Sequence, residues 1–222
     1  IIKGVISVEY KVDYISIGKV TNITFDDQKS KKTAILKEPF KGNMYLSKTG
    51  FVEDEQQYKG HGGPEKAICF YSKDHYPYWN DIIDLLPKYA IFGENITVSG
   101  LTEEHLNIGD SYQLGEAVIQ VSCPRQPCAT IAQRYGIKDL VKRMASSFKT
   151  GCYFRVLKEG YVAQNDNMKL LNTYKPQLSI YELNETRFKD HKNAERIKYI
   201  LNHDGINEET KDIFTKLQKR LS

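Results

Sequence analysis

Short apolar runs, separated by glycine or Asx turns, dominate the first 172 residues of the chain. The runs are too short for typical helices and are rich in β-branched and aromatic residues, a composition that predicts strands. Many short strands with such turns are typical of a barrel or a sandwich. We expect strands at residues 5–10, 66–71, 95–98, 111–114, 117–121 and 152–157.

Helical patterns interrupt these strands. Asp74 is the expected cap of a helix that runs to about Leu86, with Pro77 in its first turn, where the missing N–H has no helical partner to lose. Residues 129–135 and 138–148 are also expected to be helical. The first part of the chain is therefore predicted to be mixed α and β, and mainly β.

The pattern becomes helical after about residue 175. Ser179 and Glu182 form a capping box, which Leu178 and Leu183 can bracket as a hydrophobic staple. Asn207 is the expected cap of the last helix. The apolar positions of the second and third helices are Ile197, Ile200, Leu201, Ile213, Phe214, Leu217 and Leu221. We divide the chain into a strand-rich domain at 1–172 and a three-helix domain at 176–222.

Charge and composition limit the function classes. The 222 residues carry 32 Lys and Arg against 28 Asp and Glu, so the net charge of +4 gives no clear nucleic-acid footprint. A three-helix tail can be a DNA-binding helix-turn-helix, but residues 185–222 hold nine basic against seven acidic side chains. A docking or dimerisation appendage is therefore favoured for the tail, which leaves a homodimer open.

Neither the apolar runs nor the cysteines indicate a location outside the cytoplasm. No apolar run approaches the roughly 20 residues of a membrane helix, so we expect no membrane span. The four cysteines lack the density of a disulfide scaffold, which predicts a reducing, cytoplasmic location. Cys69 and Cys152 lie within strand-like runs and are expected in the core.

A stiff loop after the predicted strand 117–121 carries the most reactive candidate. Pro124 and Pro127 fix the backbone, so Cys128 is held at the end of an extended segment beside Arg125. A nearby cation lowers the pKa of a thiol and favours its nucleophilic and metal-ligating form. The alternative is a small buried residue that happens to follow proline.

A second polar segment spans residues 59–66. Gly62 and Gly63 let the backbone approach a ligand closely, and Lys59 and His61 add positive charge and proton donors. Asn95, after another glycine turn, could bond a ligand or only its own turn. A plain turn is the alternative for both segments. Zinc fits poorly, because Cys123 and Cys128 lack the close spacing and second ligand pair of zinc sites.

Several segments taken in order resemble the YiiM-type MOSC proteins, where MOSC denotes the molybdenum cofactor sulfurase carboxy-terminal domain. Any one motif is weak, but the ordered set is specific and covers most of the chain. Two features depart from the family pattern: Glu53 replaces a glycine before Asp54 with a shorter following loop, and Cys123 stands where relatives usually lack cysteine. The matching segments are 59–67, 69–79, 92–95, 114–122, 124–128 and 151–157, together with the helical tail.

The resemblance implies a MOSC β-barrel core, with peripheral helices and a C-terminal three-helix domain, that binds the molybdenum cofactor. It places the family's cysteine ligand to molybdenum on Cys128. Relatives reduce N-hydroxylated small molecules, including base analogues, to amines, and such a reaction needs an electron donor that the sequence does not identify. The family name also carries an older sulfur-carrier proposal, in which the same cysteine holds a persulfide.

The residues and the resemblance converge on one site. A soft thiolate at Cys128 suits a redox-active metal, and Arg125, Lys59 and His61 would neutralise an anionic cofactor. Gly62, Gly63 and Asn95 complete the expected cofactor-binding set. His61 is the candidate proton donor, although its ring could simply bond the cofactor. Persulfide transfer at Cys128 and a non-catalytic ligand-binding barrel are the two alternative functions.

Overall fold

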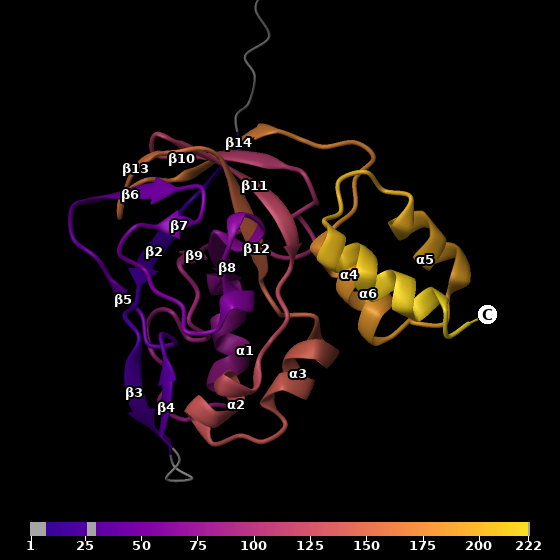
Figure 1. Cartoon of the computed structure of the whole chain (residues 1–222). Helices are drawn as coiled ribbons and strands as arrows, with labels where there is room; N and C mark the ends of the chain where they lie inside the picture. Colours follow the sequence, from indigo (N-terminus) through magenta and orange to yellow (C-terminus); the bar gives the residue numbers. More distant parts are fainter. Residues whose placement is uncertain (1–7, 26–29, 222) are drawn as a thin grey trace, which may run out of the picture.

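A nine-stranded sheet forms the centre of the molecule (Figure 1), whose residues 8–25 and 30–221 the computed structural model describes. The strand order is β1-β14-β10-β11-β12-β8-β9-β2-β5, and within those residues β8 and β9 form its one parallel pair. The strands of this sheet are β1 (Glu9–Tyr10), β2 (Val12–Ile17), β5 (Glu38–Pro39), β8 (Ile68–Ser72), β9 (Ile96–Val98), β10 (Ser111–Leu114), β11 (Ala117–Pro124), β12 (Cys152–Lys158) and β14 (Met168–Asn172).

Two smaller sheets accompany the large one. The hairpin of β3 (Thr21–Thr24) and β4 (Ser30–Thr33) extends away from the sheet (Figure 1). A three-stranded sheet pairs β6 (Asn43–Ser47) with both β13 (Gly160–Ala163) and β7 (Gly50–Phe51). In the described part of the chain no pairing joins the edge strands β1 and β5, so the predicted closed barrel is not confirmed.

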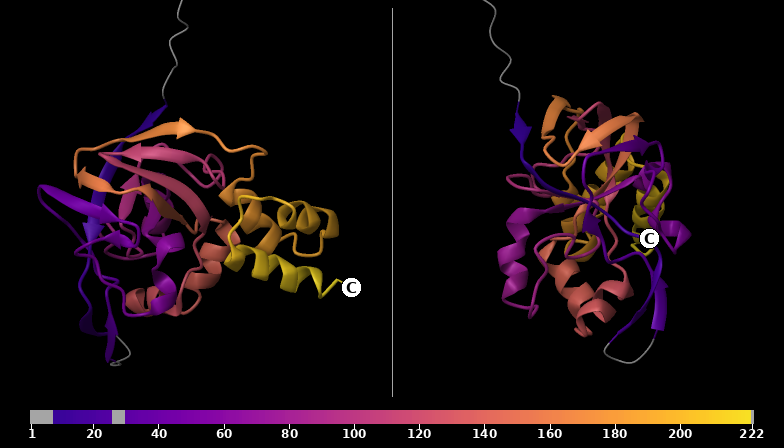
Figure 2. Two further views of the ribbon diagram at one scale, coloured as in Figure 1. Left: turned by 45° about the horizontal axis from the view of Figure 1, so that its top comes forward. Right: turned by 90° about the vertical axis from the view of Figure 1, so that its left-hand side faces the viewer.

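Six α-helices lie around the sheets. Helices α1 to α3 gather at one end of the strand-rich part, whereas α4 to α6 pack together beside it (Figures 1 and 2). Short 3-10 helices cover Lys59–His61, Pro64–Lys66 and Lys73–His75. The α-helices are α1 (Tyr76–Asn80), α2 (Ala129–Tyr135), α3 (Leu140–Ser147), α4 (Ile180–Phe188), α5 (Ala194–Leu201) and α6 (Glu208–Gln218).

The C-terminal helices share one apolar core with the sheet. Ile119 and Phe154 of the sheet belong to the same buried cluster as Ile180, Leu183 and Phe214 of the helices. Burying such a side chain contributes about 1.5–3 kcal/mol, so both parts contribute to the stability of this contact. The division at residues 172 and 176 stays a prediction, and removing the tail would uncover apolar surface on the strand-rich part.

Most of the predicted elements are confirmed with shifted ends. Strand β10 and helix α2 have the expected bounds, and β11 runs three residues further, to Pro124. The capping box of Ser179 and Glu182 is present. Of the strand expected at 5–10, residues 5–7 lie outside the described residues, and β1 covers only Glu9–Tyr10. The strand expected at 66–71 begins at Ile68, because Pro64–Lys66 forms a 3-10 turn.

The helix predicted from Asp74 to Leu86 is wrong at both ends. The Ser72 hydroxyl, not Asp74, caps the first turn, and the Asp74 carboxylate accepts the backbone N–H of Gly100 instead. Helix α1 begins at Tyr76 and ends at Asn80. Leu85, with a φ of 55°, has a left-handed backbone that no α-helix can contain.

Cys152 lies in the core as predicted, fully buried in β12 opposite Phe70. We expect Cys152→Ala to lower the free energy of unfolding by about 1 kcal/mol, as the loss of one buried atom does. Urea unfolding would measure this change, and the alkylation rate of Cys128 in the folded variant should stay the same. Full stability with altered Cys128 reactivity would assign Cys152 to the site instead of the core.

Candidate functional site

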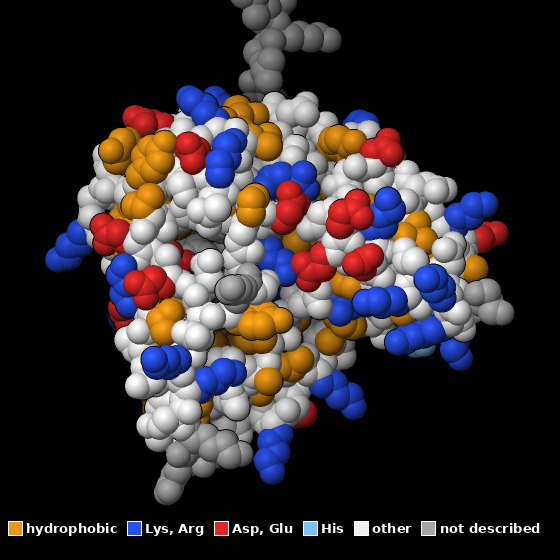
Figure 3. Space-filling view, viewed as in Figure 1, with side chains coloured by type: hydrophobic (Ala, Val, Ile, Leu, Met, Phe, Trp, Pro, Cys, Tyr) orange, Lys and Arg blue, Asp and Glu red, His pale blue; other side chains and the backbone are white. Residues whose placement is uncertain are grey.

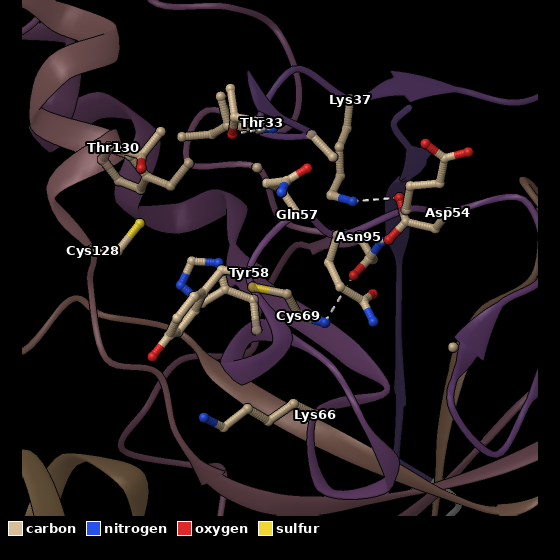
Figure 4. Close-up of a pocket in the computed structure, with 18 of the residues that line it drawn as sticks. Thr33, Lys37, Asp54, Gln57, Tyr58, Lys66, Cys69, Asn95, Cys128 and Thr130 are labelled. Carbon is tan, nitrogen blue, oxygen red and sulfur yellow. Dashed lines mark hydrogen bonds and ion pairs between the residues drawn. The ribbon is translucent and has the colours of Figure 1, made fainter. Parts of the chain in front are cut away.

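A cavity of about 430 Å³ opens between the strand-rich part and the start of α2. Cys128 and Thr130 lie on one side of it, and Lys37, Asp54 and Asn95 lie on the other (Figure 4). The walls come from residues 31–37, 49–58, 66–69, 92–95 and 125–130, with His61 and Tyr153. A volume of this size lies within the usual range for small-molecule and cofactor sites, about 300–1,000 Å³.

Cys128 is the residue before α2, and its sulfur enters this cavity. A bulge in β11 between Val121 and Cys123 bends the strand before the proline loop. Burial alone would raise the pKa of the Cys128 thiol, but a hydrogen bond from His61 and the charge of Arg125 outweigh it. Together with a hydrogen bond from Thr130 they lower that pKa to about 6. The thiolate is therefore the main form at neutral pH.

His61 ends the 3-10 helix Lys59–His61 and stands at the exposed rim of the cavity. Its ring packs edge-on against Tyr58, with 5.1 Å between the ring centroids. Gly63, at a φ of 94°, supplies the left-handed turn that starts the next short helix. This local path brings His61 and Cys128 into the lining of the same cavity, although 66 residues separate them.

Arg125 lines the same cavity and is only 7% exposed. Its backbone N–H donates to the carbonyl of Gly151, whose lack of a Cβ leaves room for Phe70. One terminal nitrogen, Nη2, donates to the Phe92 carbonyl, whereas the other, Nη1, is buried without a hydrogen-bond partner. A buried, unpaired guanidinium nitrogen is costly, so an anionic ligand in the cavity would satisfy it.

Asn95 also lines the cavity, but the protein already uses its side chain. The Asn95 amide accepts the N–H of Cys69 at 3.0 Å and donates to Asp54 Oδ2 at 2.8 Å. Asp54 also accepts the N–H of Gly18 and forms a buried ion pair with Lys37. Glu53, which replaces the family glycine, has no left-handed backbone, so a non-glycine residue fits and the Asp54 network stays intact.

The remaining predicted cofactor residues are placed less directly. Gly62 and Gly63 directly follow His61, yet neither is among the described residues that line the cavity. The side chain of Lys59 lies outside the described parts of the structure. Four other lysines line the cavity, namely Lys31, Lys32, Lys37 and Lys66, and Lys31 Nζ donates to Thr130 Oγ1 at 2.8 Å.

The first three of these lysines were missed because the β3–β4 hairpin and the segment after it were not predicted. Lys31 lies on β4, where polar residues hide the strand pattern. The paired lysines at 31 and 32 were the available signal of a basic ligand-binding wall. The cavity is consequently more basic than the sequence motifs alone indicated.

The other three cysteines differ chemically from Cys128. Burial raises the pKa of both Cys69 and Cys123 to about 11, and raises that of Cys152 well above its usual range. Cys69 is buried as predicted, but it also lines the cavity. Within residues 8–25 and 30–221, no group of three His, Cys, Asp or Glu side chains could hold a metal alone. Cys128 can therefore supply one ligand, not a complete metal site.

The lowered pKa predicts how Cys128 reactivity depends on pH. Alkylation by iodoacetamide should rise with pH and reach half of its plateau near pH 6, because the pKa is about 6. Replacing His61 by alanine removes a hydrogen bond that favours the thiolate, so the midpoint should move upward, toward about 8.5. Peptide mass spectrometry at each pH would measure both midpoints. A midpoint that falls or stays fixed in His61→Ala would contradict the assigned contact.

Comparisons with known proteins connect this cavity to a family. A family model described as the MOSC domain matches residues 57–169. The chain is 39% identical over 213 residues to the uncharacterized protein YflK of Bacillus subtilis, with 96% of each chain covered. It is 37% identical over 147 residues to protein YiiM of Escherichia coli, which covers 64% of this chain and 65% of that protein.

A third relative is much longer than this chain. A protein named Reductase from Gibberella moniliformis is 35% identical over 156 residues, which is 67% of this chain and 27% of that protein. Most of that reductase therefore lies outside the matched region. Cys128 and His61 both fall within the residues that the MOSC model matches.

Solved structures extend the similarity beyond the matched domain. The crystal structure of YiiM from Geobacillus stearothermophilus superposes with a TM-score of 0.80 at 31% identity, and covers 94% of this chain and 99% of that chain. YiiM from Escherichia coli gives a TM-score of 0.76 at 24% identity, covering 97% and 94%. The uncovered 6% in the first comparison is shorter than the tail, so at least part of the C-terminal helical segment belongs to the shared fold.

Proposed function

Because the chain belongs to the MOSC domain family, we propose that it is a molybdenum-cofactor-dependent oxidoreductase that reduces N-hydroxylated compounds to amines. N-hydroxylated base analogues are included among the proposed substrates. One observation carries the proposal: the thiolate of Cys128 shares a basic cavity with the unpaired guanidinium nitrogen of Arg125. Such a cavity suits an anionic ligand that also binds a soft sulfur.

The residues present fit the molybdenum cofactor. Cys128 would ligate the molybdenum, since thiolate sulfur is a soft ligand. Arg125 would satisfy its free Nη1 atom on an anionic oxygen of the cofactor, and Lys31 and Lys66 would add neutralising charge from the walls. Asn95 and Asp54 shape the opposite wall rather than offer free donors. The MOSC β-barrel remains part of this proposal as the scaffold for the site.

The proposed reaction reduces R–NHOH with two electrons and two protons to R–NH₂ and water. When bound, the cofactor supplies the two-electron chemistry, and an external electron donor restores it. His61 would donate a proton to the departing hydroxyl oxygen, because its ring borders the sulfur and the open rim. Exposure to solvent lets the same ring take up a new proton after each turnover.

Persulfide transfer through Cys128 is the second candidate function. A thiol with a pKa of about 6 is a good sulfur carrier as well as a good metal ligand. A carrier cysteine, however, needs only an accessible thiolate. The buried and unpaired Arg125 Nη1 therefore favours an anionic cofactor over a persulfide alone. A non-catalytic ligand-binding barrel is the third candidate, and the lowered pKa of Cys128 argues against it.

Partners and location follow from the same proposal. We propose a small-molecule substrate, an unidentified external electron donor and a cytoplasmic site of action. No helix among the described residues is long and apolar enough to cross a membrane. We propose that the chain does not bind nucleic-acid polymers, because basic and acidic side chains on the tail are nearly balanced. Light scattering would decide whether the chain forms a homodimer.

An assay with an artificial electron donor tests the proposed function. The cofactor-loaded protein would receive reduced methyl viologen, a one-electron donor, and an N-hydroxylated base analogue. We expect amine formation, measured by chromatography, with two viologens oxidised for each amine. Thiocyanate release on cyanide treatment, without any amine, would instead identify a persulfide carrier.

A further inference from the structure

One carboxylate of the C-terminal helices contacts both loops that carry the reactive pair. Glu209 is the second residue of α6. Its Oε1 atom accepts a hydrogen bond from Gln126 Nε2 at 2.6 Å, and its Oε2 atom lies 2.6 Å from Lys66 Nζ. Gln126 stands two residues before Cys128. Glu209 therefore bridges the proline loop of Cys128 and the turn that follows His61.

The contact continues to the backbone beside His61. Lys66 Nζ donates to the carbonyl of Gly60 at 2.9 Å, and Gly60 directly precedes His61. The Lys66 side chain is only 14% exposed, so its amine is confined between the two acceptors. The position of Glu209 is thus transmitted through one side chain to the residue next to the imidazole.

The carboxylate is presented by a fixed element. Asn207 caps α6 by accepting the N–H of Thr210 at 2.9 Å. Phe214 buries the same helix in the core, at 2% exposure. Side chains of both charge signs meet where the C-terminal helices adjoin the strand-rich part (Figure 3).

We propose that Glu209 is a positioning residue, which holds the His61 turn and the Cys128 loop together and so sets the position of the imidazole relative to the sulfur. The Glu209 side chain is 41% exposed, and ion pairs this exposed contribute little to stability. Its effect is therefore on the geometry of the pair rather than on the free energy of unfolding. The inference rests on the proposed function only in taking Cys128 as the reactive residue.

The first test compares Glu209→Ala with Glu208→Ala, a neighbour on the same helical turn whose side chain is 89% exposed. Amide hydrogen exchange should become several-fold faster in residues 58–66 and 124–128 of Glu209→Ala, with an unchanged unfolding midpoint. Glu208→Ala should leave both loops unchanged. Glu209→Gln should recover part of the protection, since its amide still accepts one hydrogen bond. Unchanged exchange in Glu209→Ala would overturn the proposal.

The second test asks whether Glu209 acts through His61. In the cofactor-free chain, Glu209→Ala should slow the alkylation of Cys128 by iodoacetamide about two- to fivefold, because the imidazole of His61 is no longer held beside the sulfur. In a His61→Ala background the same change should have no further effect. An equal slowing in both backgrounds would overturn the positioning role.

Neither measurement requires molybdenum or substrate. A chain that shows the coupling but lacks reductase activity would contradict the proposed function and leave the role of Glu209 in place. A chain that reduces N-hydroxylated compounds, but in which Glu209→Ala has no effect that depends on His61, would support the proposed function and contradict the role of Glu209.

Discussion

Replacing Cys128 by serine should abolish amine formation and lower the retention of molybdenum. The serine hydroxyl stays neutral at pH 7 and is a poor substitute for a soft thiolate. Changing a residue that only supports a metal ligand already costs 10–100-fold, so removing the ligand itself should cost at least about a hundredfold in rate. Initial rates and metal content of the purified variant would measure both effects.

Cys123→Ser is the matched control for this change. Cys123 lies five residues earlier in the same segment, but its thiol is 3% exposed and burial raises its pKa to about 11. The control should keep its molybdenum and most of its turnover. If Cys128→Ser retained full turnover while Cys123→Ser lost it, the wrong sulfur would have been assigned to the metal.

Replacing Arg125 by methionine should lower cofactor affinity by about tenfold or more, as the loss of a supporting group beside a metal site does. The variant keeps a long apolar side chain, but it removes the buried charge and the free Nη1 donor. The cofactor affinity of Arg125→Lys should fall between those of the parent and Arg125→Met, because lysine keeps the charge and loses the forked geometry. Cofactor content after dialysis against a salt series would measure the losses, which should grow with salt.

Arg143→Met is the charge-matched control for the arginine series. Arg143 lies on α3, and its side chain is 47% exposed and paired with Asp139, outside the cavity lining. This variant should bind the cofactor as the parent does at every salt concentration. Equal occupancy in Arg125→Met and Arg143→Met would remove Arg125 from the site.

Local patterns predicted the elements whose signals lie within a few residues. The capping box at Ser179 and the cap at Asn207 are contacts between residues three apart, so the sequence contains all of their determinants. Strand β10 lies between turns and alternates clearly, which fixed its bounds. Leu221 was predicted among the apolar positions of the last helix, but it lies beyond the end of α6 and is 40% exposed.

Elements that depend on distant contacts could not be predicted in this way. Asp74 has the composition of a helix cap, but the N–H of Gly100 competes for its carboxylate in the folded chain. Strand β6 is held by β13, which begins more than 100 residues later. No local periodicity contains that pairing, so β6 and its small sheet were missed.

The candidate site shows the same division. The proline loop of Cys128 and the glycine turn of His61 were visible in the sequence, and the structure places both side chains in the lining of one cavity. The ordered motifs, rather than physical chemistry alone, connected them beforehand. The bridging role of Glu209 was invisible, because it depends on where α6 packs against two loops far away in the chain.

The most direct measurement is the metal and pterin content of the full chain, purified from a host that makes the molybdenum cofactor. The proposed function predicts about one molybdenum and about one pterin per chain, both greatly reduced in Cys128→Ser. Labile sulfur on Cys128 without molybdenum or pterin would contradict it and identify a sulfur carrier.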